Sequence, residues 1–70
     1  MNDDGATYEI ACIFSGRETD KAVLIIDPAS GEELWIPLSQ VIEMHGREDG
    51  KKSTGRIVMT EWIAKKKGLC

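Results

Sequence analysis

The chain has 70 residues and a formal net charge of −3, with 41% apolar and 30% charged residues. This length allows one domain, near the lower limit for a core without metal or disulfide cross-links, and the composition excludes a wholly disordered chain. No apolar run approaches the roughly 20 residues that span a bilayer, and the N-terminus is acidic where a secretory signal is basic, so we expect a cytoplasmic protein without a membrane partner.

Residues 1–6 are predicted to be a disordered acidic tail, and residues 7–70 a single small β-barrel domain. Apolar side chains recur at every second position from Tyr8 to Phe14, which is the period of a strand with one buried face. A turn is predicted at residues 15–20, which contain Gly16. The β-branched run at residues 21–27 then predicts a central strand.

Residues 28–31, Pro-Ala-Ser-Gly, predict a hairpin turn into a third strand at residues 32–37. Pro37 lacks a backbone donor and should end that strand. A helical turn at residues 38–40 and a fourth strand at residues 41–45 follow. Residues 46–55 are rich in glycine and charge and predict a mobile hairpin loop, before a short closing strand at residues 56–59.

The C-terminal segment predicts a helix over residues 60–67. Thr60 can cap it through its hydroxyl, three lysines favour its negative end, and Gly68 should stop it. Such a short helix is unstable alone and must dock on the sheet. We expect Trp35 and Trp62 to be mainly structural, with their rings anchoring this helix on the sheet.

These elements predict a mainly β fold, namely a small antiparallel five-stranded SH3-like or OB-like barrel, or a rolled sheet, with a short C-terminal α-helix. Cys12 lies in a strand and should be a small core side chain, and Cys70 should be an exposed thiol. A disulfide between the two is an alternative that the sequence leaves open.

No residue pattern points to catalysis. His45 is the single histidine and lies beside the glycine-rich loop, so a strand-end histidine explains it better than an acid–base or metal-binding role. The adjacent carboxylates at residues 3–4 and 32–33 point to opposite faces of a strand and do not form a catalytic pair. We therefore expect no enzyme activity, no cofactor and no metal.

Charge divides the chain into two parts of opposite sign. Residues 1–46 hold nine acidic and two basic residues, for a net charge of −7, whereas residues 47–70 hold seven basic and three acidic residues, for a net charge of +4. A basic face can bind phosphates or an acidic partner, but similar charges also solvate small surfaces without binding anything. The sequence leaves both interpretations open.

Three blocks of sequence resemble a known group of proteins. They are residues 19–24 (Thr-Asp-Lys-Ala-Val-Leu), residues 34–41 (Leu-Trp-Ile-Pro-Leu-Ser-Gln-Val) and residues 61–69 (Glu-Trp-Ile-Ala-Lys-Lys-Lys-Gly-Leu). Over residues 17–69 the chain resembles small, uncharacterised tailed-phage and prophage proteins that share a W-[IL]-P-x-S-Q turn and a C-terminal E-W-[IL]-A-x-x-K-G-[LI] helix. Thr60 replaces their usual proline, which also suits a helix start.

The resemblance implies a phage origin, and hence the cytoplasm of a bacterial host, more strongly than it implies an activity. It transfers no catalytic residue. It implies framework or contact roles for Trp35, Pro37, Ser39, Gln40 and Trp62.

The sequence supports two functional hypotheses. The first is a non-enzymatic phage accessory protein that binds a protein: a host factor, a defence component, or a replication or recombination partner. The alternative is a nucleic-acid-binding small barrel that uses the basic region 47–67. The candidate partner-binding residues are Trp35, Arg47, Lys51, Lys52, Arg56, Lys65, Lys66 and Lys67. Self-association through an unpaired strand edge is a further alternative.

Overall fold

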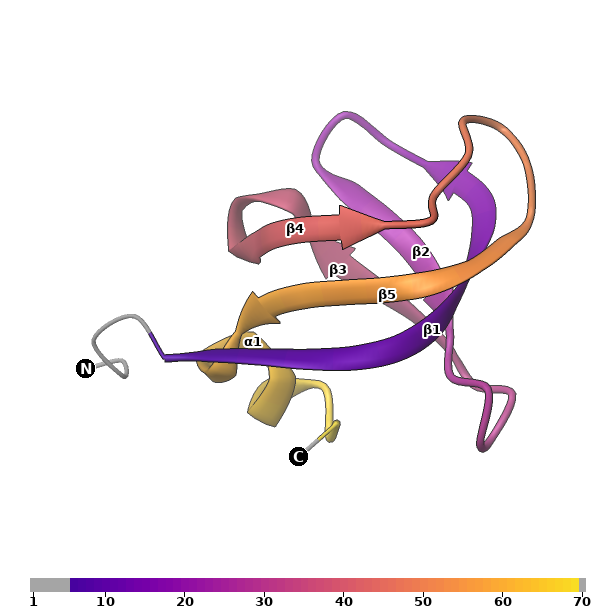
Figure 1. Ribbon diagram of the computed structural model, residues 1–70. Helices are drawn as coiled ribbons and strands as arrows, with labels where there is room; N and C mark the ends of the chain where they lie inside the picture. The colour runs from indigo at the N-terminus through magenta and orange to yellow at the C-terminus, as the bar shows by residue number, and fades with distance from the viewer. Residues whose placement is uncertain (1–5, 70) are drawn as a thin grey trace.

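The longest strand, β1 (Thr7–Glu18), lies at the centre of one antiparallel sheet with the strand order β3-β2-β1-β5-β4 (Figure 1). The computed structural model describes residues 6–69. The other elements are β2 (Ala22–Ile26), β3 (Glu33–Pro37), a 3-10 turn (Leu38–Gln40), β4 (Val41–His45), β5 (Ser53–Thr60) and α1 (Glu61–Lys66). The predicted mainly β fold with a short C-terminal helix is therefore confirmed.

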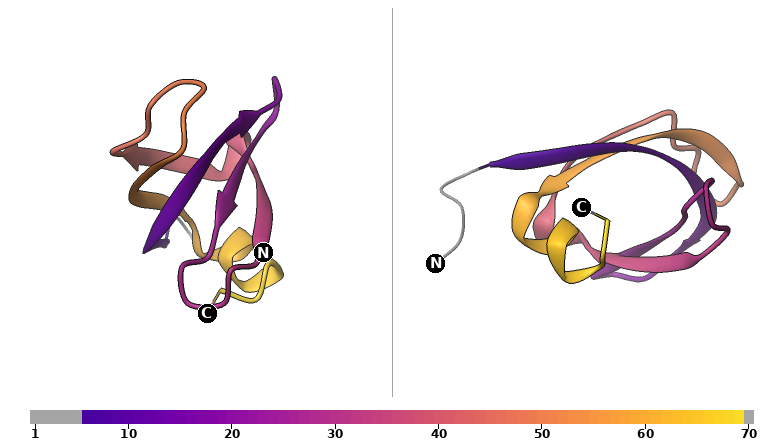
Figure 2. Two further views of the ribbon diagram at one scale, coloured as in Figure 1. Left: turned by 90° about the vertical axis from the view of Figure 1, so that its right-hand side faces the viewer. Right: turned by 90° about the horizontal axis from the view of Figure 1, so that it is seen from below.

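The sheet curls without closing into a barrel, as the view along the roll shows (Figure 2). Its two edges are β3 and β4, which do not pair and are joined only by the 3-10 turn. Of the predicted alternatives, the rolled sheet is the one that the protein adopts. Pro37 ends β3 as expected, since it has no N–H to donate.

The core lies inside the roll and follows the predicted alternation of β1. Tyr8, Ile10, Cys12 and Phe14 face the core, while the residues between them face outwards. The fully buried side chains of the core cluster come from four strands and the helix: Cys12, Phe14, Val23, Ile25, Ile36, Ile57, Met59, Ile63 and Ala64. Strands and helix therefore share a single apolar core.

Two boundaries predicted from the sequence were wrong. The predicted turn at residues 15–20 is largely strand, because β1 continues through an irregularity between Phe14 and Glu18, where Gly16 adopts a φ of 88°. The closing strand begins at Ser53 instead of residue 56, because Ser53 and its neighbour pair with the long β1. Glycine signalled a turn at both places, but it serves a bulge in one and a close strand contact in the other.

Gly55 lies where β5 passes tightly against β4 and the core. A Cβ at this position would overlap the carbonyl oxygen of His45 and lie 3.0 Å from Cε2 of the Phe14 ring. Its φ is not positive, so the constraint is one of space and not of backbone conformation. The absence of a side chain here lets the sheet coil at this point.

Helix α1 forms as its end signals predict. The backbone N–H of Ile63 donates to the Thr60 hydroxyl at the start, and at the end Leu69 N–H donates to the Ala64 carbonyl around Gly68, which has a φ of 75°. Ile63 and Ala64 bury the helix against the sheet, and the Tyr8 hydroxyl donates to the Leu69 carbonyl. Docking on the sheet is thus confirmed.

Cys12 is buried with a free thiol, as predicted for a core residue, whereas Cys70 and the predicted tail at residues 1–5 lie outside the described residues. Burial raises the pKa of the Cys12 thiol from 9.0 to about 11, because desolvation disfavours the thiolate. Below pH 9 both the folded and the unfolded chain hold the proton. Between pH 9 and 11 only the unfolded chain releases it, so stability falls as pH rises.

In a Cys70→Ser background, we expect Cys12 to resist a thiol reagent such as DTNB at pH 8 until the protein is unfolded in urea. Between pH 9 and 11 the free energy of unfolding should drop by about 2–3 kcal/mol more than in the matched Cys12→Ala variant. Urea titrations across this range measure the difference. Equal pH dependence of the two proteins would contradict the expectation.

Candidate functional site

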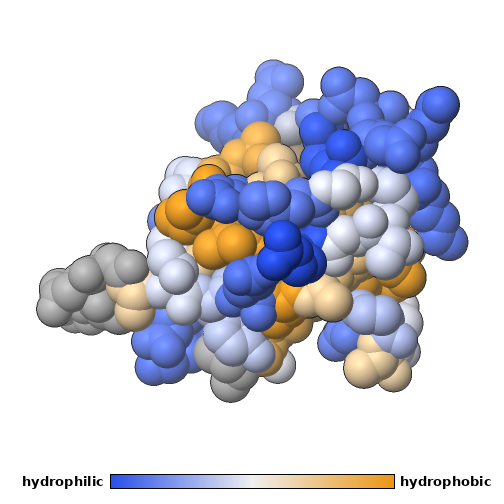
Figure 3. Space-filling model, in the orientation of Figure 1, coloured by the Kyte–Doolittle hydropathy of each residue, from blue (hydrophilic) through white to orange (hydrophobic). Residues whose placement is uncertain are grey.

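The large apolar side chains that the described chain exposes are two tryptophans and an isoleucine. Trp35 is 39% exposed, Trp62 is 43% exposed and Ile42, beside the irregular start of β4, is 52% exposed. Apolar residues are also exposed around β4, while hydrophilic residues cover the loops at the upper right (Figure 3). The expectation that both indoles are mainly structural anchors is therefore wrong.

The register of each element explains why the indoles point outwards. In β3 successive side chains alternate, so that Ile36 enters the core and Trp35 lies on the outer face, opposite Leu24 of β2. In α1, adjacent residues differ by about 100° around the axis, so burial of Ile63 turns Trp62 towards solvent. Leu24 is buried although it lies outside the core cluster, as expected for a residue covered on the Trp35 side.

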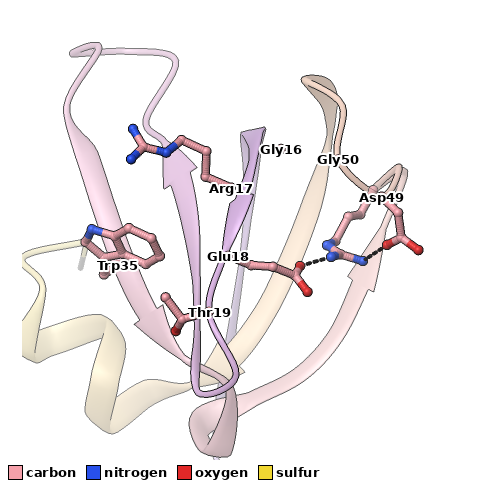
Figure 4. Close-up of a pocket in the computed structure, with 8 residues that line it drawn as sticks. Gly16, Arg17, Glu18, Thr19, Trp35, Asp49 and Gly50 are labelled. Atoms are coloured by element: carbon pink, nitrogen blue, oxygen red, sulfur yellow. Dashed lines mark hydrogen bonds and ion pairs between the residues drawn. The ribbon is translucent and has the colours of Figure 1, made fainter.

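Trp35 forms one wall of an open groove of about 590 Å³. The groove runs from β3 to the far end of β1 and to the loop between β4 and β5 (Figure 4). Its lining consists of Gly16, Arg17, Glu18, Thr19, Trp35, Arg47, Asp49 and Gly50. Figure 4 shows Trp35 and Thr19 on one side, the Glu18 and Asp49 side chains on the other, and Arg17 reaching from β1 towards the Trp35 side.

The two arginines of the groove differ in their partners. Arg47 forms ion pairs with Glu18 and with Asp49, the latter at 2.7 Å, and its side chain is only 22% exposed. Arg17 is exposed and forms no ion pair with any residue in the range 6–69. The charges of the four charged lining residues sum to zero. Both carboxylates, however, pair with Arg47, so Arg17 is left without a carboxylate of the groove as its partner.

The loop that forms the far wall lies directly against β1. A Cβ on Gly16 would lie 2.9–3.1 Å from the backbone atoms of Lys51, and Glu48 N–H donates to the Ser53 hydroxyl at 3.2 Å. An isolated antiparallel β-bridge between Glu48 and Lys51 joins the two sides of the loop. The sequence predicted a mobile loop over residues 46–55; the structure shortens it and gives it contacts that its composition did not indicate.

The structure does not bring the predicted basic residues together. Lys51 and Lys52 precede one end of β5, whereas the three lysines at residues 65–67 follow its other end, in and just after α1. Arg56 lies between them on the outer face, paired with Glu9. Of the candidate residues, only Trp35 and Arg47 line the groove.

The second exposed indole has a basic neighbour. Lys66 Nζ lies 5.1 Å from the centroid of the Trp62 ring, within the range of a cation–π interaction. Lys65 forms a 3.8 Å ion pair with Glu61 one turn earlier in the helix. This end of the molecule therefore presents an aromatic ring and ammonium groups, separate from the residues that line the Trp35 groove.

The site offers no arrangement of metal ligands within residues 6–69: no three His, Cys, Asp or Glu side chains gather in a way that could hold an ion. His45 Nε2 lies 2.8 Å from a Glu43 carboxylate oxygen on the exposed face at the end of β4, where the strand-end interpretation placed it. No helix in the described part of the chain has the length and apolar character needed to cross a membrane.

Sequence reasoning missed six residues of the groove: Gly16, Arg17, Glu18, Thr19, Asp49 and Gly50. They were assigned to a turn and a mobile loop, so no common surface was expected for them. A positive φ at Gly16 within a strand brings this part of β1 under the loop. Only the pairing of β1 with both neighbours reveals that contact.

Comparison with protein-family models, with curated proteins and with solved structures gives no match to this chain.

Proposed function

We propose that this protein is a small, non-enzymatic accessory protein of the phage type that binds another protein through the surface around Trp35. The observation that carries the proposal is the exposure of Trp35 in a groove beside Arg17, which forms no ion pair within residues 6–69. Tryptophan and arginine are enriched among the residues that contribute most to protein–protein binding. An indole with this much exposed area gains more from a partner surface than from water.

The distribution of basic residues supports a protein target over a nucleic acid. A nucleic-acid backbone needs several uncompensated cations along its path. Here the lysines lie at opposite ends of β5, and Arg47 and Arg56 are already paired with carboxylates. A protein partner requires no such continuous basic track.

The proposal is tested by capture of proteins from bacterial lysates, prepared with and without phage infection, on the wild-type protein and on Trp35→Ser. We expect at least one protein to be retained by the wild type and depleted at least tenfold on the variant. Each candidate is then measured with purified components by calorimetry. Retention of the same proteins on both, or of none above background, would refute binding through Trp35.

A second function is favoured by one observation, the exposed Trp62 with Lys66 beside it. An aromatic ring next to ammonium groups can stack a base and contact its phosphates. If this site binds single-stranded oligonucleotides, fluorescence anisotropy should show affinity that falls steeply with salt and is lost when residues 65–67 become glutamate. Absence of binding at low salt excludes this function.

A further inference from the structure

We infer that the Trp35 groove binds an acidic side chain on an extended segment of the partner protein, with Arg17 as the residue that pairs with the carboxylate. The inference rests on the proposed protein-binding function and specifies the chemistry of the partner. Arginine matches a carboxylate with two parallel hydrogen bonds, which a lysine cannot do.

Arg17 is the group in the lining that remains available. Arg47 is held by two carboxylates, and one of these, Glu18, is the neighbour of Arg17 in sequence. Arg17 has no ionic partner within residues 6–69, and its side chain extends towards the Trp35 side of the groove (Figure 4). A carboxylate placed beside Trp35 would supply the missing partner.

The indole provides the apolar half of the same contact. Trp35 is 39% exposed and forms a wall of the groove that Arg17 also lines. The methylene groups of an aspartate or glutamate, and the backbone that bears it, can pack on the ring while the carboxylate meets the guanidinium. Gly50 leaves room for that backbone, since nothing lies within 4 Å of the position of its Cβ.

The far wall is fixed before a partner arrives. Arg47 ties the loop to Glu18 of β1, and Lys51 lies against Gly16 through its backbone. A groove with a preformed wall loses little conformational freedom on binding, which favours recognition of a short segment. The volume of about 590 Å³ suits a few residues of a peptide.

Charge favours one carboxylate over a polyanion. The charges of Arg17, Glu18, Arg47 and Asp49 sum to zero, so the lining can pair one carboxylate with Arg17, whereas Glu18 and Asp49 would repel further negative charges. The lining contains no lysine that could offset this repulsion. An acidic peptide is therefore the occupant that the groove fits.

The probe is a displayed library of random dodecapeptides, selected on the folded protein, with enriched sequences then synthesised for calorimetry. We expect enrichment of peptides that contain Asp or Glu flanked by apolar residues. Arg17→Glu and Trp35→Ser should each weaken binding at least tenfold, and replacing the acidic peptide residue by Lys should restore binding to Arg17→Glu. Circular dichroism verifies that each variant folds.

The chain offers a matched control for each change. Arg56→Glu alters an exposed arginine outside the groove, and Trp62→Ser removes an indole of similar exposure at the other end of the molecule. Both should bind the selected peptides as the wild type does. Peptides that bind regardless of Arg17 and Trp35 would overturn this inference while leaving a protein-binding function standing elsewhere.

Two other outcomes also overturn it. If no peptide is enriched, the groove does not recognise a short acidic segment, and the lysate experiment decides the broader proposal independently. If a single-stranded oligonucleotide binds and Arg17→Glu abolishes that binding, the groove serves nucleic acid instead.

Discussion

Replacing Gly55 with alanine should unfold the protein or destabilise it by at least about 3 kcal/mol, the upper part of the range for overpacked positions. The added methyl group would overlap the His45 carbonyl oxygen and crowd the Phe14 ring, and the first of these is backbone that cannot move without breaking the β4–β5 pairing. A domain of this size has a total stability of about 4–10 kcal/mol. Urea unfolding followed by circular dichroism measures the loss.

Gly31→Ala is the matched control. Gly31 has a φ of 78° in the hairpin turn, and nothing lies within 4 Å of the position of its Cβ. Alanine there costs only the left-handed backbone conformation, about 1–2 kcal/mol. If the two variants were equally stable, the lack of space for a side chain at Gly55 would not be the cause of the destabilisation.

Replacing Ile63 with alanine should destabilise the protein by about 3 kcal/mol, whereas Trp62→Ala should cost no more than about 1 kcal/mol. Ile63 is 3% exposed within the core cluster, so its truncation loses apolar burial and leaves a cavity. Trp62 is 43% exposed and is neither in the core cluster nor among the side chains packed against it, so its truncation opens no cavity in the core. The comparison identifies which residue holds the helix on the sheet.

The same urea titrations decide this prediction, with the helix content of each variant recorded before unfolding. Alanine has a higher helix propensity than either isoleucine or tryptophan. A loss of stability in either variant therefore cannot come from helix propensity. A larger loss for Trp62→Ala than for Ile63→Ala would restore the tryptophan as the anchor.

Local signals in the sequence were sufficient for most of the fold. The period of two in β1, the Pro28–Gly31 turn and the Thr60 and Gly68 helix ends each depend on neighbouring residues, and each lies where it was expected. The extent of β1 past Gly16 was not predictable in this way. A glycine in a bulge and a glycine in a turn have the same local signature, and only pairing with a distant strand separates them.

The site was less predictable because it depends on which face each side chain occupies. Trp35 was a candidate contact from its sequence block, but its exposure follows from the register that puts Ile36 in the core. Arg47 was chosen for its charge, and the sequence could not show that Glu18, 29 positions earlier, neutralises it. Arg17 was overlooked for the same reason: its lack of a partner is a property of the folded chain.

Both ends of the described chain lie at the same pole of the molecule. Glu61 N–H donates to the Ala6 carbonyl at 3.0 Å, and the Tyr8 hydroxyl, near the start of β1, donates to the Leu69 carbonyl. Gly16, at the groove, lies near the other end of β1. A fluorophore or affinity handle attached before Ala6 would thus join the molecule at the end of β1 opposite to Gly16.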